Sequence, residues 1–98
     1  MSHLNFLIFK CDIMPEISRF YGIIILMNYK DHLPPHFHAI YNEYEIIVNI
    51  QDGETKGRMP ARALRIILEW WELNREALED RWDKSRKGMP LDSIEPLK

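Results

Sequence analysis

Three of the four histidines in this 98-residue chain fall within seven positions, in the run Asp31-His32-Leu33-Pro34-Pro35-His36-Phe37-His38. Histidine changes its charge near neutral pH and is also the commonest protein ligand of metal ions. On a strand, His36 and His38 would project from one face and Phe37 from the opposite face, which we expect to be the covered one. The cluster therefore predicts a site, without indicating which chemistry takes place there.

The histidine cluster has three interpretations. In the first, hydrogen bonds satisfy the histidines at a strand edge and their role is structural only. In the second, His32, His36 and His38 bind a zinc or nickel ion, with Asp31 as an alternative third ligand or as the group that orients an imidazole. In the third, the same three histidines are catalytic, and one accepts a proton while another donates one, as in phosphodiester cleavage. The residues alone leave open which interpretation holds and whether the protein is an enzyme.

A line of basic residues could serve the third interpretation. Arg58, Arg62 and Arg65 stand three or four residues apart across a predicted strand–helix junction, with Lys56 just before them. Arg58 and Arg62 in particular could contact a phosphate. The alternative is an ordinary solvated face on which Arg65 pairs with Glu69. The sequence contains no glycine-rich phosphate loop and no serine or cysteine nucleophile motif beside them.

The middle of the chain predicts the strands that must position the histidines. Gly22 interrupts the first of them and indicates a bulge or a close backbone approach. The Pro34-Pro35 pair cannot donate ladder hydrogen bonds, so we expect it to connect two strands. Asp52-Gly53 predicts a two-residue hairpin before a short last strand. The predicted strands cover residues 17–30, 36–41, 44–50 and 54–58.

From Pro60 onward the apolar residues recur at the spacing of a helix. Pro60 suits a first helical turn, and a broad apolar face continues as far as Trp71. Asn74 is expected to cap a second helix that ends before Gly88, and the residues from Pro90 on should run extended along the surface. An antiparallel meander of about four strands, followed by a C-terminal helical hairpin packed on one sheet face, would bury both apolar sets. The predicted fold is therefore α+β, with a single domain over residues 14–98.

The composition is that of an ordinary globular chain, with 46% hydrophobic and 29% charged residues. The formal net charge of −2 argues against a domain that binds nucleic acid by bulk charge. A single cysteine allows no intramolecular disulfide and fits a reducing cytoplasm. The most apolar run, Ile23 to Met27, is much shorter than the roughly 18–20 residues of a membrane-spanning helix, so we expect no membrane partner. Residues 1–13 are expected to form an extra strand or a disordered leader, and Met14 could be an alternative start.

Four segments of the chain resemble a small bacterial family that is catalogued as a domain of unknown function, DUF4160. The segments are Met14-Pro15-Glu16-Ile17-Ser18-Arg19-Phe20-Tyr21-Gly22, Asp31-His32-Leu33-Pro34-Pro35-His36-Phe37-His38-Ala39, Pro60-Ala61-Arg62-Ala63-Leu64 and Gly88-Met89-Pro90-Leu91. The resemblance implies a cytoplasmic protein that is often encoded beside another small protein, an arrangement similar to toxin–antitoxin pairs. It thereby implies a small companion protein as a partner and an activity on RNA, although the mildly acidic charge counts against an RNA-cleaving toxin.

Overall fold

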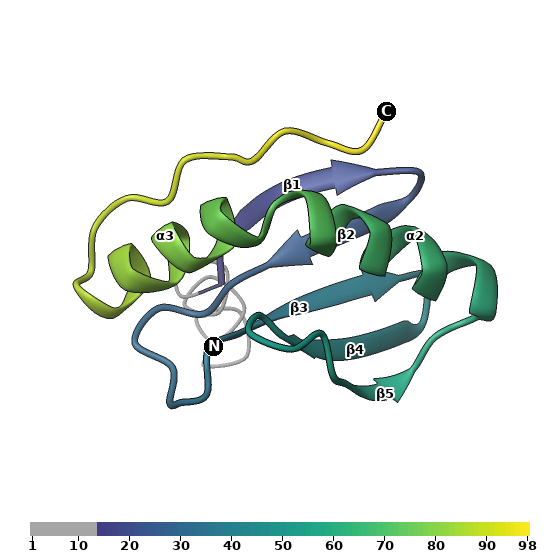
Figure 1. Ribbon diagram of the computed structural model, residues 1–98, viewed down its shortest axis with the longest axis horizontal. Coiled ribbons are helices and arrows are strands. Elements are labelled where there is room, and N and C mark those ends of the chain that lie inside the picture. The colour runs from purple at the N-terminus through teal and green to yellow at the C-terminus, as the bar shows by residue number, and fades with distance from the viewer. Residues whose placement is uncertain (1–13) are drawn as a thin grey trace, which may run out of the picture.

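The computed structural model describes residues 14–98, so the extra strand or disordered leader predicted for residues 1–13 lies outside the described part of the chain. Five antiparallel strands form one sheet in the order β1-β2-β3-β4-β5 (Figure 1). Two helices follow the sheet in the sequence, so the predicted α+β class, with strands before helices, is confirmed. The elements are β1 (Glu16–Phe20), β2 (Ile23–Leu26), β3 (His36–Tyr41), β4 (Tyr44–Asn49), β5 (Thr55–Arg58), α2 (Ala61–Leu73) and α3 (Arg75–Arg86).

The sheet has five strands rather than about four because the predicted first strand folds back on itself. Phe20 pairs directly with Ile23, so only Tyr21 and Gly22 remain for the turn between β1 and β2. Both turn residues have positive φ angles, 51° and 79°, as a type I′ turn requires. The first position of such a turn is usually Asn, Asp or Gly. Because Tyr21 occupies this position here, the sequence did not indicate a turn. Gly22 is therefore a turn residue, and the predicted bulge at this position is wrong.

The connection between β4 and β5 is also longer than the predicted two-residue hairpin. It spans residues 50–54 and is closed by a hydrogen bond from the Gly53 N–H to the Asn49 carbonyl, 2.8 Å long. Ile50 is fully buried, and its carbonyl accepts a hydrogen bond from Trp71 Nε1 at 2.8 Å. The turn is longer because its first residue contributes to the core before the chain reverses.

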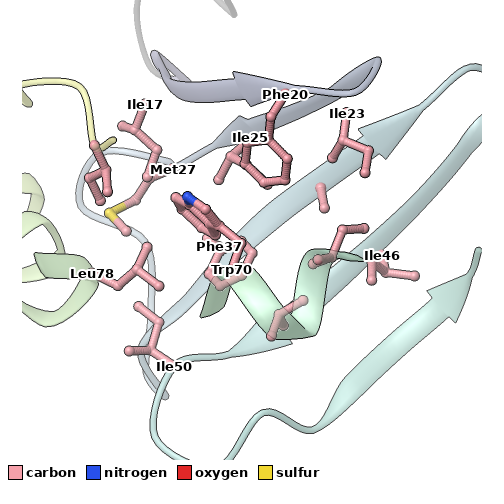
Figure 2. Close-up of a cluster of buried hydrophobic side chains, with 14 of the residues drawn as sticks. Ile17, Phe20, Ile23, Ile25, Met27, Phe37, Ile46, Ile50, Trp70 and Leu78 are labelled. Carbon is pink, nitrogen blue, oxygen red and sulfur yellow. The ribbon is translucent and has the colours of Figure 1, made fainter. Parts of the chain in front are cut away.

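The two helices cover one face of the sheet and bury an apolar core against it (Figure 1). Trp70 of α2 lies at the centre of this core, with ring centroids 5.3 Å from Phe20 and 5.7 Å from Phe37 (Figure 2). Phe37 and Ala39 of β3 are fully buried beneath the helices. Because side chains alternate along a strand, His36 and His38 project from the opposite face. The predicted facing of β3 is confirmed.

The segment after α3 runs back along β1 as an extended chain (Figure 1). The Ile94 N–H donates to the Ile17 carbonyl at 2.7 Å, and Ser18 Oγ donates to the Ile94 carbonyl at 2.9 Å. Trp70 Nε1 donates to the Glu95 carbonyl at 2.8 Å. The segment is therefore bonded to the outer edge of β1, whose backbone groups would otherwise be open to another chain.

The two helices meet at Asn74, which stands at the N-cap position of α3 as predicted but does not cap that helix with its side chain. Its side-chain amide donates to the Trp70 carbonyl at 2.8 Å and makes no capping bond to α3. The Asn74 side chain therefore provides a hydrogen-bond donor for a carbonyl in the last turn of α2. Glu76 provides a negative charge in the first turn of α3. Within residues 14–98, neither helix has the length and apolar character needed to cross a membrane.

The facing of α2 gives a prediction for stability. Ile67→Ala should lower the free energy of unfolding by about 2–5 kcal/mol, because Ile67 is fully buried and its truncation leaves a cavity. Leu73→Ala is the matched control in the same helix. Because Leu73 is 68% exposed, this substitution should change the free energy of unfolding by no more than about 0.5 kcal/mol. Urea unfolding followed by tryptophan fluorescence measures both values. Equal losses in the two variants would contradict this placement of the helix.

Candidate metal centre

The loop between β2 and β3 carries Asp31 to the end of the sheet where β3 begins. This loop is bonded to α3 at two points: the Lys30 N–H donates to the Ser85 carbonyl at 3.1 Å, and Arg86 donates to the Asp31 carbonyl at 2.8 Å. Figure 1 shows the loop beside the C-terminal end of α3. Helix α3 therefore holds the loop in the position that places Asp31 beside His36.

The Asp31 carboxylate makes polar contacts through both oxygens. Oδ2 accepts a hydrogen bond from Asn28 Nδ2 at 3.1 Å and lies 2.9 Å from His36 Nε2. Oδ1 accepts from the His32 N–H at 2.9 Å. Burial raises the pKa of Asp31, but the hydrogen bonds from Asn28 and His32, together with the charge of His36, bring the pKa below its ordinary value. The site therefore favours an ionised carboxylate.

His36 has an acceptor at each of its ring nitrogens. Nδ1 lies 2.8 Å from the Pro34 carbonyl oxygen and Nε2 lies 2.9 Å from Asp31 Oδ2. A neutral imidazole has only one N–H, so both contacts are favourable only with an added positive charge. That charge is either a second proton on the ring or a metal ion between Nε2 and the carboxylate. The indole of Trp82 packs on the imidazole, with centroids 5.3 Å apart, and holds its orientation.

His38 has a similar arrangement with a different acceptor. Nδ1 lies 3.2 Å from Glu45 Oε2 on β4, while Nε2 is buried and has no hydrogen-bond partner among the described residues. Asn28 Oδ1 is buried and unpartnered in the same way, and both residues line one cavity. Buried polar atoms without partners are rare in native proteins. Two of them in one cavity indicate a place for an ion or a polar ligand.

Asp31, His36 and His38 each offer one ligand atom, and these atoms lie within 4.8 Å of one another. Atoms bound to one zinc ion at about 2.0–2.2 Å are about 3.3–3.6 Å apart in a tetrahedral site. Small shifts of the side chains would therefore fit this set around an ion. No other group of three such ligands comes together within residues 14–98.

The ligand set opens into a cavity of about 420 Å³. The strand residues that line it lie on the sheet face opposite the helices, and α3 contacts the set at the end of the sheet where β3 begins. Leu33 and Pro34 of the loop and Ile47 of β4 give this cavity apolar surface, and Lys56 of β5 lines it as well. The strand register makes Ile47 the direct partner of both His38 and Lys56, so the three residues form one row across the sheet. The cavity therefore combines the ligand set, an apolar surface and a cation.

The structure brings together two of the three histidines that the sequence singled out. His36 and His38 lie in the ligand set, and their side chains are each 11% exposed. The His32 side chain is 91% exposed at the rim, with Nδ1 3.0 Å from Asp31 Oδ1. In this geometry Asp31, and not His32, contributes the third ligand atom.

The two arginines predicted as phosphate contacts do not line this cavity. Arg62 lines a separate hollow with Tyr21 and Tyr41. Arg58 of β5 pairs with Glu45 of β4 and projects from the same face as Lys56, in the next row of the sheet. It lines another shallow hollow. The basic residue of the histidine cavity is Lys56, whose position only the register between β4 and β5 reveals.

The lowered pKa of Asp31 predicts how an Asp31→Asn variant depends on pH. The ionised carboxylate stabilises the metal-free fold above the unfolded pKa of about 3.9, and this contribution is lost as pH falls through the lower folded value. The stability difference between wild type and variant should therefore be larger near about pH 5 than near about pH 3. Urea unfolding in the presence of a chelator measures this difference. A difference that grows toward low pH would contradict the lowered pKa.

Comparison with known proteins assigns the chain to a family without assigning an activity. Residues 22–83 match the family described as "Domain of unknown function (DUF4160)", and this range includes the whole ligand set and Lys56. No curated protein and no solved structure matches the chain. The match covers more than half of the sequence, and the chain therefore belongs to the DUF4160 family.

Proposed function

We propose that this protein is a metal-binding domain in which Asp31, His36 and His38 hold one divalent ion, either zinc or nickel. The observation that carries the proposal is the buried Nε2 atom of His38, which has no hydrogen-bond partner within residues 14–98 and belongs to a convergent set of three ligand residues. Two imidazole nitrogens and one carboxylate oxygen form a donor set that suits zinc and other late first-row metal ions.

The groups behind the ligands support the same proposal. Histidine ligands of metal ions usually donate their other N–H to a carboxylate or a backbone carbonyl, which fixes the tautomer and the orientation of the ring. Glu45 stands at Nδ1 of His38, and the Pro34 carbonyl stands at Nδ1 of His36. Both rings are therefore supported in the tautomer that leaves Nε2 available to an ion.

Three protein ligands leave at least one position on the ion for water or another molecule. Structural zinc sites usually have four protein ligands, whereas catalytic zinc sites have three and keep a position open. The ligand set here lines a cavity that solvent can enter. We therefore propose an exchangeable site that presents the ion to a ligand, rather than one that only stabilises the fold.

Direct acid–base catalysis by the histidines has less support than metal binding. A general acid or base needs a ring nitrogen within reach of the substrate proton. Both nitrogens of His36 face protein acceptors, and His32 lies at the rim beside Asp31. Nδ1 of His38 faces Glu45, while its Nε2 is buried. The arrangement of His36 is thus better suited to binding an ion than to exchanging protons with a substrate.

An RNA-directed activity within a toxin–antitoxin-like module, with a small companion protein, is the second candidate. The observation that favours it is Lys56, which lines the same cavity as His36 and His38 and could contact a phosphate of the chain. In this proposal His36 and His38 would hold the ion, and the ion would supply positive charge for the phosphate group of the RNA.

Metal uptake tests the first proposal. Protein purified without an affinity tag should bind one zinc or nickel ion per chain near neutral pH, and His36→Ala and His38→Ala should each abolish this binding. His32→Ala is the matched control and should retain it, because His32 lies outside the ligand set. Binding should weaken below about pH 6, since the ligands must be deprotonated. Calorimetry measures the binding. At a free metal concentration of 100 times Kd, the free energy of unfolding should rise by about 2.7 kcal/mol.

Two results would count against the metal site. One is wild-type protein that contains no ion on elemental analysis and whose melting temperature does not change when zinc or nickel is added. The other is binding that His32→Ala removes as completely as His38→Ala does. Circular dichroism of each variant shows whether a loss of binding is a loss of folding.

Growth tests the RNA-directed candidate. Production of the protein without a companion should slow growth and degrade cellular RNA, and His38→Ala should relieve both effects while the protein stays folded. We expect a loss of activity of about 100-fold or more, as is typical when a catalytic group is removed. His32→Ala serves as the control that keeps the ligand set intact. Normal growth and intact RNA in cells that produce the wild type would reject this candidate and leave metal binding in place.

A further inference from the structure

We infer that the cavity binds an oxyanion, the phosphoryl group of a phosphate ester or of free phosphate, which bridges the bound metal ion and the ammonium group of Lys56. The inference rests on the proposed metal site and adds the class of ligand that the open position takes. Three features carry it: the row of residues across the sheet, the absence of an ion pair between Lys56 and any described residue, and the charge of the cavity.

The row across the sheet sets the separation between the ion and the ammonium group. His38, Ile47 and Lys56 are register partners on β3, β4 and β5. Adjacent strands lie about 4.8 Å apart, so the backbones of His38 and Lys56 are separated by about 10 Å and their side chains leave the same face. An oxyanion with one oxygen about 2.1 Å from the ion and another about 2.8 Å from the ammonium can occupy the space above Ile47.

Lys56 is available for an external anion. Its ammonium group forms no ion pair with any residue that the structure describes, although it lines the cavity. Lys84 differs, because its Nζ lies 3.3 Å from Asp80 Oδ2. A lysine that faces a cavity without a carboxylate partner can form a charge-assisted hydrogen bond to a ligand.

The charges that line the cavity make anion binding depend on the metal. Lys56 contributes one positive charge, and Asp31 and Glu54 contribute one negative charge each. With neutral histidines the metal-free cavity is therefore net negative, and with a second proton on His36 it is neutral, so in neither state does it carry a net positive charge for an anion. A divalent ion reverses this balance to a net positive charge. Because binding free energies are linked, the anion must then strengthen metal binding by the same factor as the metal strengthens anion binding.

The apolar surface of the cavity adds a preference among phosphoryl ligands. Leu33 is 63% exposed and lines the cavity together with Pro34. Ligand sites commonly combine a few polar groups that fix orientation with apolar surface that packs on the rest of the ligand. A phosphate ester with an apolar substituent can use both kinds of surface, whereas inorganic phosphate uses only the ion and Lys56.

Cobalt-loaded protein provides the test, because the visible spectrum of cobalt reports a change of its ligands. Inorganic phosphate and phenyl phosphate should each change this spectrum, and neither should bind the metal-free protein. Lys56→Met should lower the affinity of the cobalt-loaded protein for both phosphates by about tenfold at low salt, while the affinity for cobalt changes by less than about twofold. Lys56→Arg should keep anion binding. Lys87→Met is the control, because Lys87 is exposed at the end of α3 and lies outside the cavity.

The outcomes separate this inference from the metal site itself. Tighter binding of phenyl phosphate supports an ester as the ligand, and equal binding of the two supports free phosphate. The inference is overturned if cobalt binds but phosphate leaves the spectrum unchanged, or if Lys56→Met behaves like Lys87→Met. A protein that binds no cobalt would overturn the metal site, and the oxyanion site with it.

Discussion

The packing of Phe37 against Trp70 is the interaction on which the candidate site depends. It fixes which face of β3 points toward the helices, because Phe37 is fully buried and its ring lies 5.7 Å from that of Trp70. A slip of one residue in the register of β3 would exchange the two faces of the strand. It would move His36 and His38 into the apolar core and expose Phe37. The core therefore holds the two histidines together on the open face.

Helix α3 provides the second constraint, because it fixes the third ligand. Asp31 belongs to a loop, and loops are usually the most mobile part of a fold. Here the loop is bonded to α3 through Arg86 and through the backbone of Lys30, and Trp82 packs on the His36 ring. The helix that closes the core thus also holds the loop residue and the strand residues in one geometry. This link explains how a chain of 98 residues can support a convergent site.

The sequence was sufficient for the parts of the structure that follow from local periodicity. The alternation along β3 placed His36 and His38 on one face, and the change of period at Pro60 located the helices. It was not sufficient where a local preference was overridden. Tyr21 occupies a turn position that usually holds Asn, Asp or Gly, and Asn74 satisfies the helix before it instead of the one after it. Lys56 was named only within a line of basic residues, and its place beside His38 could not be predicted because it depends on the pairing of three strands.

The central claim is that Asp31, His36 and His38 bind one ion, and anomalous diffraction from crystals grown with zinc tests it most directly. We expect a single anomalous peak about 2.0–2.2 Å from Asp31 Oδ2, His36 Nε2 and His38 Nε2, with a ligand that is not protein at the remaining position. The contact of 2.9 Å between His36 Nε2 and Asp31 Oδ2 should then lengthen to about 3.3 Å or more, because both atoms bind the ion in place of sharing a hydrogen bond. A zinc ion bound elsewhere, with that contact unchanged and His38 Nε2 still unpartnered, would contradict the account.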